Sequence, residues 1–450
     1  MTERSSATES DQARYDVASL GARTIASPLG LSTAMGDQVP NYVPDGMRVL
    51  DQVELQPGAA VDEACALEKA GPRELIYFDP KKTRAGIVTS GGLCPGINNV
   101  IRSIVFELVH KYAIESVTGF RYGFAGLVPE AGVGAEPILL GPDQVRHVHR
   151  FGGTILGTSR GQQDPKVMVD TLVSRGINLL FTIGGDGTMR AAHVIAEEIE
   201  RRGEKISVVG VPKTIDNDIA FVDKTFGFET AVAMARTAID AAHTEALSVM
   251  NGIGLVKLMG REAGFIAAHA AMASHDVNVC LVPEVAYRLD GPTGLLAHLE
   301  RRLSERHHAV VVVAEGCATQ LLQAGDVADA PRDASGNIRF QDLDVGKYLQ
   351  KVITKHFKER NIPLTLKYID PSYMLRGVPA GAIDSVFCAE LARYAVHAAM
   401  AGKTDMMVGR LHRAFTHVPL PLVLSKKKRI DPDGELWLAV TESTGQPRFV

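Results

Sequence analysis

Cysteine is scarce in this sequence, and no metal-binding pattern accompanies it. The 450 residues include five cysteines, an odd number, with no CxxC spacing. Such usage excludes a disulfide framework and a cysteine-ligated zinc site. There is no HExxH motif, and the one HxH pair, His147-Val-His149, has no recognisable third ligand. We therefore expect reduced thiols and a cytoplasmic protein.

Long apolar runs and an excess of charge are also missing. No stretch approaches the roughly 20 apolar residues that cross a bilayer, and the polar N-terminus lacks the apolar region of a signal peptide. Lys and Arg total 48 against 52 for Asp and Glu, a net charge of −4. Nucleic-acid binding relies on a cationic surface. We therefore expect neither a membrane nor a nucleic acid as partner.

The regular part of the sequence begins at Arg84, where short apolar runs alternate with segments of helical periodicity. This alternation is typical of β-α units that build a parallel sheet covered on both faces. The predicted strands are 85–89, 116–120, 177–183, 207–211, 253–258, 277–282, 309–314 and 364–369. Eight strands are many for one open sheet, and the chain is too long for one core. We predict an α/β protein with two Rossmann-like parallel-sheet lobes and extensions at both ends.

Helical spacing of apolar residues predicts a helix from Met189 to Ile199 and two more over 226–243 and 382–401. The expected parts are an N-terminal extension (1–80), a first lobe (81–225, completed by 377–411), a second lobe (226–376) and a C-terminal tail (412–450). A basic run in this tail, Lys426–Arg429, is typical of a solvated surface.

Ligands of such sheets bind beyond the carboxyl ends of the strands, and two glycine-rich turns lie there. The turn TSGGLCPGINN (89–99) precedes a predicted helix, which suits an anion, although a plain βα turn is the ordinary alternative. The turn GGDGT (184–188) sets Asp186 among glycines, so its carboxylate can hold magnesium against phosphate oxygens. Helix capping by Asp186 is the alternative, but glycines on both sides favour phosphate binding.

Two carboxylates crowd the next turn, PKTIDND (212–218). Asp216 and Asp218 repel each other, so one tends to keep its proton or to recruit a cation. A natural division is that one accepts the proton of a substrate hydroxyl while the other helps to hold magnesium. A turn with internal Asx hydrogen bonds is the alternative, and the neighbouring Lys213 weighs against it.

Three further turns follow predicted strands. In MGREAG (259–264), Arg261 can fork onto a phosphate or a sugar, and the other two are AEG (314–316) and YMLRG (373–377). The string GTSRG (157–161) formally matches GxSxG, but a nucleophile elbow needs an apolar strand before it and a helix after it. A serine hydrolase is therefore disfavoured.

Together these turns resemble the phosphofructokinase family over about 84–410. The motifs that carry the resemblance stand in family order: TSGGLCPGINN, GGTILGTSRG (152–161), GGDGT, PKTIDND, MGR, AEG and the YxxR of 373–376. The resemblance implies an ATP-dependent 6-phosphofructokinase of glycolysis, which transfers the γ-phosphoryl group of Mg-ATP to the 1-hydroxyl of fructose 6-phosphate. It implies Mg²⁺ as the metal, ATP as co-substrate, allosteric control, and a homo-oligomer that is a tetramer or a dimer.

The family's roles carry over to the matching positions of this sequence. The first lobe then binds ATP through Gly91, Arg160, Gly161, Gly185, Asp186, Gly187 and Thr188. The second lobe binds fructose 6-phosphate, together with residues of the PKTIDND turn: Lys213, Thr214, Ile215, Asp216, Met259, Gly260, Arg261, Glu315, Tyr373, Met374, Leu375 and Arg376. In the catalytic set, Asp216 is the general base, and Thr214 and Arg261 assist it. Asp186 and Asp218 are the expected metal ligands.

Two positions bear on the phosphoryl donor. Lys213 is typical of pyrophosphate-dependent members, whereas those members usually have Asp where this chain has Gly187. A carboxylate there would face the α-phosphate of a nucleotide, and one like-charge pair at ~4 Å costs on the order of 4 kcal/mol, roughly a thousandfold in affinity. Gly187 therefore predicts ATP, as in the similar plant and trypanosomatid members.

Two alternatives stay open at this point. One is a pyrophosphate-dependent phosphotransferase acting on the same sugar, and the other is a non-catalytic regulatory subunit that binds sugar phosphates. Gly252 stands where the shorter bacterial members have an arginine that reaches a neighbouring subunit, and Lys367 stands where an arginine is common. The resemblance therefore does not extend to sugar-phosphate contacts across a subunit interface.

Overall fold

The computed structural model describes residues 14–55, 57–58, 60–129, 136–321, 331 and 343–449. They form two compact units, which we call unit 1 and unit 2. Unit 1 comprises Met1–Thr214, Ile219–Gly227 and Val378–Lys427, and unit 2 comprises Ile215–Asp218, Phe228–Gly377 and Lys428–Val450. One four-residue piece, Ile215–Asp218, therefore belongs to unit 2 although its chain neighbours on both sides belong to unit 1.

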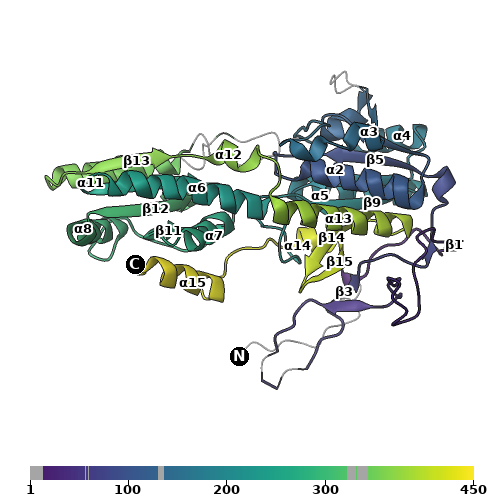
Figure 1. Cartoon of the computed structure of the whole chain (residues 1–450), viewed down its shortest axis with the longest axis horizontal. Helices are drawn as coiled ribbons and strands as arrows, with labels where there is room; N and C mark the ends of the chain where they lie inside the picture. The colour runs from purple at the N-terminus through teal and green to yellow at the C-terminus, as the bar shows by residue number, and fades with distance from the viewer. Residues whose placement is uncertain are drawn as a thin grey trace. The chain divides into compact units, whose positions relative to one another are not determined.

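Unit 1 is built on a nine-stranded sheet with the order β2-β3-β15-β14-β9-β8-β5-β6-β7 (Figure 1). The five strands from β14 to β6 are parallel to their neighbours, and the strands outside them are antiparallel. Every residue of β8 and β9 is buried, as expected for central strands covered on both faces. The strands are β2 (Arg48–Leu50), β3 (Ala66–Lys69), β5 (Arg84–Thr89), β6 (Ser116–Phe120), β7 (Ile138–Leu139), β8 (Leu179–Gly184), β9 (Ser207–Pro212), β14 (Met406–Leu411) and β15 (Ala414–Pro419).

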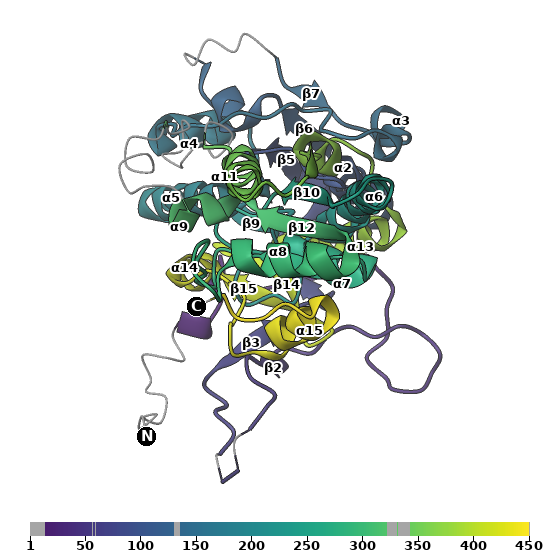
Figure 2. The ribbon, with the colours of Figure 1, turned by 90° about the vertical axis from the view of Figure 1, so that its left-hand side faces the viewer.

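Helices cover both faces of this sheet. Figure 2 shows α4 (Pro165–Ser174), α5 (Asp186–Arg202) and α14 (Leu420–Ser425) on one side, and α2 (Ile97–Phe106) and α13 (Ala382–Met400) on the other. The helix α5 buries the predicted apolar stripe and ends at Gly203 in the left-handed conformation. The N-terminal part also contains an antiparallel two-stranded ribbon of β1 (Ile25–Ala26) and β4 (Leu75–Ile76). A further short helix of unit 1 is α3 (Pro142–Val145).

Unit 2 contains a four-stranded sheet, with the order β11-β12-β10-β13, in which all strands are parallel. Its strands are β10 (Gly252–Leu258), β11 (Val279–Leu281), β12 (His308–Ala314) and β13 (Thr365–Ile369). The helices that pack around it are α6 (Phe228–Leu247), α7 (Phe265–Ser274), α8 (Leu295–Arg306), α11 (Val345–Glu359) and α15 (Glu435–Thr444), with two short helices, α9 (Ala318–Leu321) and α12 (Ser372–Arg376).

The predicted α/β class with two parallel-sheet lobes is confirmed. All eight predicted strands are present, four in each unit, and their ends differ from the prediction by at most two residues. The strands β2, β3, β14 and β15 were not predicted. Because β15 returns antiparallel to β14 and pairs with β3, the N-terminal extension and the first part of the expected C-terminal tail are strands of the unit 1 sheet.

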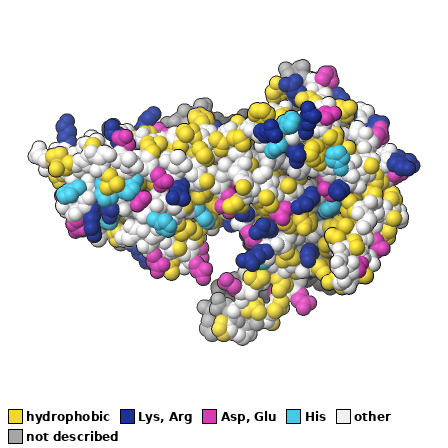
Figure 3. All heavy atoms as spheres, in the orientation of Figure 1, with side chains coloured by type: hydrophobic (Ala, Val, Ile, Leu, Met, Phe, Trp, Pro, Cys, Tyr) yellow, Lys and Arg dark blue, Asp and Glu magenta, His cyan; other side chains and the backbone are white. Residues whose placement is uncertain are grey.

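The surface has mixed charge. Figure 3 shows Lys and Arg side chains interspersed with Asp and Glu on the face that it displays. Within the described ranges, no helix combines the length and the apolar composition needed to span a membrane.

Two glycines of β10 allow the helix α6 to lie directly against this strand. A Cβ atom on Gly252 would lie 2.1 Å from the carbonyl oxygen of Ala246, and one on Gly254 would lie 2.6 Å from that of Ala242. Both obstacles are backbone atoms, which cannot rotate away. The absence of an arginine at position 252 thus has a local steric reason.

We expect Gly252→Ala to destabilise the protein by about 1–3 kcal/mol, because the new methyl group forces α6 away from β10. The measurement is the midpoint of chemical unfolding. Gly187→Ala is the matched control, since a Cβ there meets no heavy atom within 4 Å, and its effect should stay within about 1 kcal/mol. Equal midpoints for the two variants would contradict this packing.

Candidate active site

The two glycine-rich segments of unit 1, 89–92 and 157–161, lie side by side. The N–H of Gly91 donates to the carbonyl oxygen of Ser159 over 3.2 Å, and the hydroxyl of Thr158 donates to the carbonyl of Gly91 over 2.6 Å. Gly91 has φ of +86°, a conformation that favours glycine. Two motifs, whose residues Gly91 and Thr158 are 67 positions apart in the sequence, thus form one surface at the carboxyl end of β5.

The GGDGT turn connects β8 to α5. Gly185 is the N-cap residue, and its carbonyl accepts the N–H groups of Thr188 and Met189. Asp186 is therefore the first residue of the helix and not its cap, so the capping alternative is wrong. Its side chain is 37% exposed and lies 3.8 Å from Arg190. A partly exposed carboxylate beside free space at Gly187 can meet a metal ion from solvent.

Lys213 connects the two glycine-rich turns. Its ammonium group donates to the carbonyl oxygen of Gly92 over 2.5 Å, and its backbone N–H donates to the carbonyl of Gly184 over 2.8 Å. The residue is 5% exposed. Its Nζ would lie 3.5 Å from a Cβ on Gly91, so the cation stands directly beside the turn. Lys213 therefore links the 89–92 turn to the end of β8 within unit 1 through these two hydrogen bonds.

Asp216 is a half-buried residue of unit 2, and its carboxylate oxygen Oδ1 is buried. Burial is the largest cause that raises its pKa, and the nearby carboxylates of Asp218 and Glu315 raise it further. The charge of Arg261 and a hydrogen bond from the Arg261 backbone N–H act in the opposite direction. The net effect is a pKa above the ordinary value of an aspartate, which lets this group exchange a proton near neutral pH.

The MGR and AEG turns meet next to this carboxyl group. The N–H of Gly316 donates to the carbonyl of Gly260 over 3.0 Å, and a Cβ on Gly316 would lie 2.1 Å from the carbonyl oxygen of Arg261. Only glycine fits this approach. The contact brings Glu315 near Arg261, whose charge lowers the pKa of Glu315 against the larger opposing effect of burial. The carboxyl groups of Asp216 and Glu315 and the guanidinium group of Arg261 thus lie together in unit 2.

Lys257 is a charged residue of this region that the sequence analysis missed. It is 3% exposed within the strand β10, its Nζ lies 2.8 Å from Asp370, and its charge acts on Glu315. The signal was present in the sequence, because Lys257 is the only charged residue of the apolar run GIGLVKL. Charged residues are almost never buried without a partner.

The YMLR residues divide by exposure. Tyr373 and Met374 are 69% and 61% exposed, and the guanidinium of Arg376 lies 5.0 Å from the centre of the Tyr373 ring. Leu375 is fully buried. Ile215 is likewise buried, so these two predicted substrate residues can offer a ligand only their backbone. Among the other predicted residues, Arg160 is exposed, and Gly161, Thr214 and Met259 are half-buried.

Each unit thus carries groups whose chemistry suits a different part of a phosphoryl transfer. Unit 1 presents glycine-rich turns, a helix start and a carboxylate, which suit phosphates and a metal ion. Unit 2 presents a buried carboxyl group with a raised pKa beside a guanidinium. Among the described residues, no three His, Cys, Asp or Glu side chains gather into a metal cluster. These features define the class as an α/β phosphotransferase.

The chain belongs to the phosphofructokinase family. The family model named Phosphofructokinase matches residues 84–399. The ATP-dependent 6-phosphofructokinase of Borreliella burgdorferi is 51% identical, over 86% of this chain and 86% of that protein. The ATP-dependent 6-phosphofructokinase of Amycolatopsis methanolica is 48% identical, over 91% and 89%, and the ATP-dependent 6-phosphofructokinase 7 of Arabidopsis thaliana is 46% identical, over 85% and 77%.

Solved structures share the fold at low identity. A pyrophosphate-dependent phosphofructokinase from Marinobacter aquaeolei superposes with a TM-score of 0.64 at 19% identity, over 81% of this chain and 92% of that one. The phosphofructokinase of Pichia pastoris gives 0.61 at 21% identity, over 81% and 37%. The family resemblance found from the motifs is confirmed.

The raised pKa of Asp216 has a consequence for stability. The unfolded chain loses this proton near pH 3.9, whereas the folded protein keeps it to higher pH, so folding loses stability as the pH rises between the two values. We expect Asp216→Asn to raise the melting temperature at pH 8 relative to wild type, and to change it little at pH 4. Thermal unfolding at both pH values measures this.

Asp290→Asn is the control for this comparison, because Asp290 is an exposed aspartate of the same unit. Its melting temperature should follow wild type at both pH values. An Asp216→Asn variant that melts below wild type at pH 8 would contradict the electrostatic account.

Proposed function

We propose that this chain is an ATP-dependent 6-phosphofructokinase, which forms fructose 1,6-bisphosphate and ADP from fructose 6-phosphate and ATP. Two observations carry the proposal, one in each unit: the raised pKa of Asp216 in unit 2 and the open space at Gly187 in unit 1. The names of the relatives support it, because proteins at 42–51% identity over most of their length are called ATP-dependent 6-phosphofructokinases.

The nucleotide is proposed to bind in unit 1, on Gly91, Arg160, Gly161 and the turn 185–188. The main-chain N–H groups at the start of α5 and the helix dipole favour phosphate oxygens there. Magnesium fits Asp186, since Mg²⁺ is commonly held by one or two carboxylates plus substrate phosphates. The bound ion would neutralise charge on the transferring phosphate. Asp218 is the second proposed ligand.

The sugar phosphate is proposed to bind in unit 2. Arg261 and Arg376 supply guanidinium groups for a phosphate, and Glu315 can accept a hydrogen bond from a sugar hydroxyl. The exposed ring of Tyr373 supports Arg376. Asp216 then accepts the proton of the 1-hydroxyl, which turns this oxygen into a nucleophile, while Thr214 contributes a hydrogen bond. A base with a pKa near the working pH is the efficient choice for this step.

Replacing the base tests this assignment. Asp216→Asn should lower kcat by about 10² to 10⁴, with KM for fructose 6-phosphate within a few-fold of wild type, because the amide keeps the shape but cannot accept the proton. Steady-state kinetics with saturating Mg-ATP measure this. Wild-type turnover by the variant would remove Asp216 from the role of base.

The main alternative is a pyrophosphate-dependent enzyme, and Lys213 is the feature that favours it. The buried ammonium group of Lys213 already has a partner in unit 1, the carbonyl of Gly92. Its presence is therefore accounted for by the architecture of the glycine-rich turns, and it discriminates little between donors. A non-catalytic subunit is disfavoured, because Asp186, Asp216 and Asp218 are all present.

Gly187 is the position that should decide the donor. The space around it is free, so Gly187→Asp should fold normally and act only on ligands. We expect kcat/KM for ATP to fall on the order of a thousandfold, since the new carboxylate repels the α-phosphate. Gly187→Ala controls for the added Cβ and should retain far more ATP activity. The account fails if both variants use ATP equally well.

The same proposal includes a homo-oligomer, a tetramer or a dimer, that works in the cytoplasm under allosteric control. The five cysteines support a reducing compartment, because none of them forms a disulfide and four of them are buried. It also assigns ATP to the lobe 81–225 with 377–411, and fructose 6-phosphate to 226–376.

A further inference from the structure

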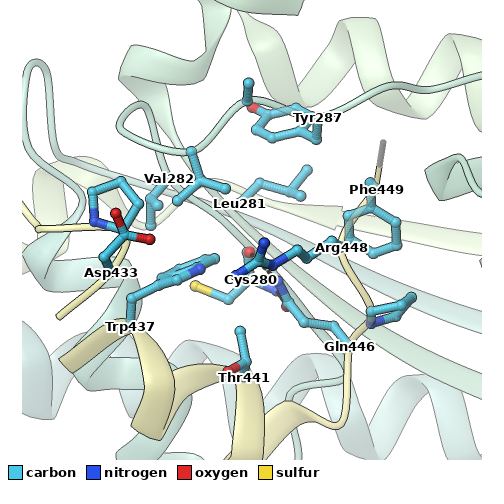
Figure 4. Close-up of a pocket in the computed structure, with 14 residues that line it drawn as sticks. Cys280, Leu281, Val282, Tyr287, Asp433, Trp437, Thr441, Gln446, Arg448 and Phe449 are labelled. Carbon is cyan, nitrogen blue, oxygen red and sulfur yellow. Dashed lines mark hydrogen bonds between the residues drawn. The ribbon is translucent and has the colours of Figure 1, made fainter. Parts of the chain in front are cut away.

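The C-terminal segment, which we define as residues 428–449, is part of unit 2 and packs on its helix α7 and its edge strand β11. Its helix α15 lies against α7, and the side-chain amide of Gln446 pairs with the backbone of Cys280 on the edge strand β11. The Cys280 N–H donates to this amide over 2.6 Å, and the amide donates back to the Cys280 carbonyl over 3.2 Å. Figure 4 shows Gln446, Trp437 and Phe449 around Cys280. The segment is therefore firmly anchored.

The first two residues of this segment contact the turns of the candidate site. The N–H of Lys428 donates to the carbonyl of Asp218 over 3.0 Å, and Arg429 lies 3.7 Å from the carboxylate of Glu262 in the MGREAG turn. Three side chains of the basic run, at 426, 427 and 429, are exposed. The charges of this run are therefore mostly solvated, while the backbone at Lys428 is held by the turn that contains Asp216.

Glu284 joins the segment to the sugar-phosphate turn. One of its carboxylate oxygens accepts the N–H of Ile430 over 3.0 Å, and its two oxygens accept the N–H of Gly264 over 3.0 and 3.1 Å. Gly264 is the last residue of the MGREAG turn and the N-cap residue of α7. A Cβ on Gly264 would lie 2.4 Å from Val282, so glycine is needed for this close approach.

A carboxylate at a helix N-terminus would also serve as a simple stabiliser of α7. Two observations point beyond that role. The same carboxylate binds a second backbone N–H from a segment more than 140 residues away, and the turn it holds contains Arg261, whose N–H donates to Asp216. Glu284 thus fixes one end of a turn whose other end supports the catalytic carboxylate.

We propose that Glu284 is a positioning residue for the sugar-phosphate site, and that the C-terminal segment acts on Arg261 through it. This inference rests on the proposed function only for the identity of the sugar. Glu284 touches no reacting atom. It holds Gly264 and Ile430 together, so that Arg261 keeps the orientation in which its guanidinium and its N–H face the substrate phosphate and Asp216.

The test uses Glu284→Gln in the full-length protein, because the amide keeps the size but loses the charge and one acceptor. Hydrogen exchange followed by mass spectrometry, without any ligand, should show faster exchange in peptides covering 259–268 and 428–434. In kinetics, KM for fructose 6-phosphate should rise about tenfold, with KM for ATP within about twofold of wild type. Arg429→Ala, which removes only the exposed pair with Glu262, should give a smaller rise in the same KM.

Glu442→Gln is the matched control, because Glu442 is an exposed glutamate in α15 of the same segment, and both readouts should match wild type. Unchanged exchange at 259–268 in Glu284→Gln overturns the proposal, whatever the activity. An equal rise of both KM values with a lowered melting temperature also overturns it, because that pattern marks a purely structural role. A wild type that ignores fructose 6-phosphate would instead refute the proposed function, since the exchange result does not depend on it.

Discussion

The central constraint on the site is the contact between Arg261 and Asp216, in which the charge and the backbone N–H of Arg261 oppose the burial that raises the pKa of Asp216. The piece Ile215–Asp218 leaves the unit of its chain neighbours and packs in unit 2, where the oxygen Oδ1 of Asp216 is buried. Burying a carboxylate is unfavourable unless it is hydrogen-bonded or keeps its proton. The N–H and the guanidinium of Arg261 offset part of this unfavourable free energy. The part that is not offset favours the protonated carboxyl group and so raises the pKa of Asp216.

The glycines around this contact have a common physical reason. Gly316 lets the AEG turn reach the backbone of Arg261, Gly260 leaves room for the carbonyl oxygen of Ala263 in its own turn, and Gly264 lets α7 begin against Val282. In unit 1, by contrast, Gly187 has free space around it. The first group is required by packing within the protein, whereas Gly187 has no such requirement and leaves room for a ligand. Glycines in similar turns are therefore present for different reasons: some are needed for packing, and Gly187 leaves space beside the turn.

Much of the fold and of the candidate site could be predicted from the sequence, because the central strands are continuous apolar runs and the glycine-rich and acidic turns follow them. The eight strands and the turns with Asp186, Asp216 and Arg261 fall in this class. The strands β14 and β15 were missed, because their pairing is remote in sequence: β15 pairs with β3, more than 300 residues away, and β14 pairs with β9. The contacts of Glu284 were missed because one of them, with Ile430, joins residues 146 positions apart. A lone glutamate after a strand carries no local signal of such a contact. Lys257 was visible as a charge within an apolar run but was not interpreted.

The central claim is that unit 1 accepts an adenine nucleotide and unit 2 a sugar phosphate whose hydroxyl Asp216 activates. The most direct measurement is the rate at which the purified wild-type protein forms fructose 1,6-bisphosphate from fructose 6-phosphate with Mg-ATP and, separately, with Mg-pyrophosphate. The account predicts that kcat/KM for ATP exceeds that for pyrophosphate by at least about a hundredfold. Rapid turnover with pyrophosphate and none with ATP would contradict it.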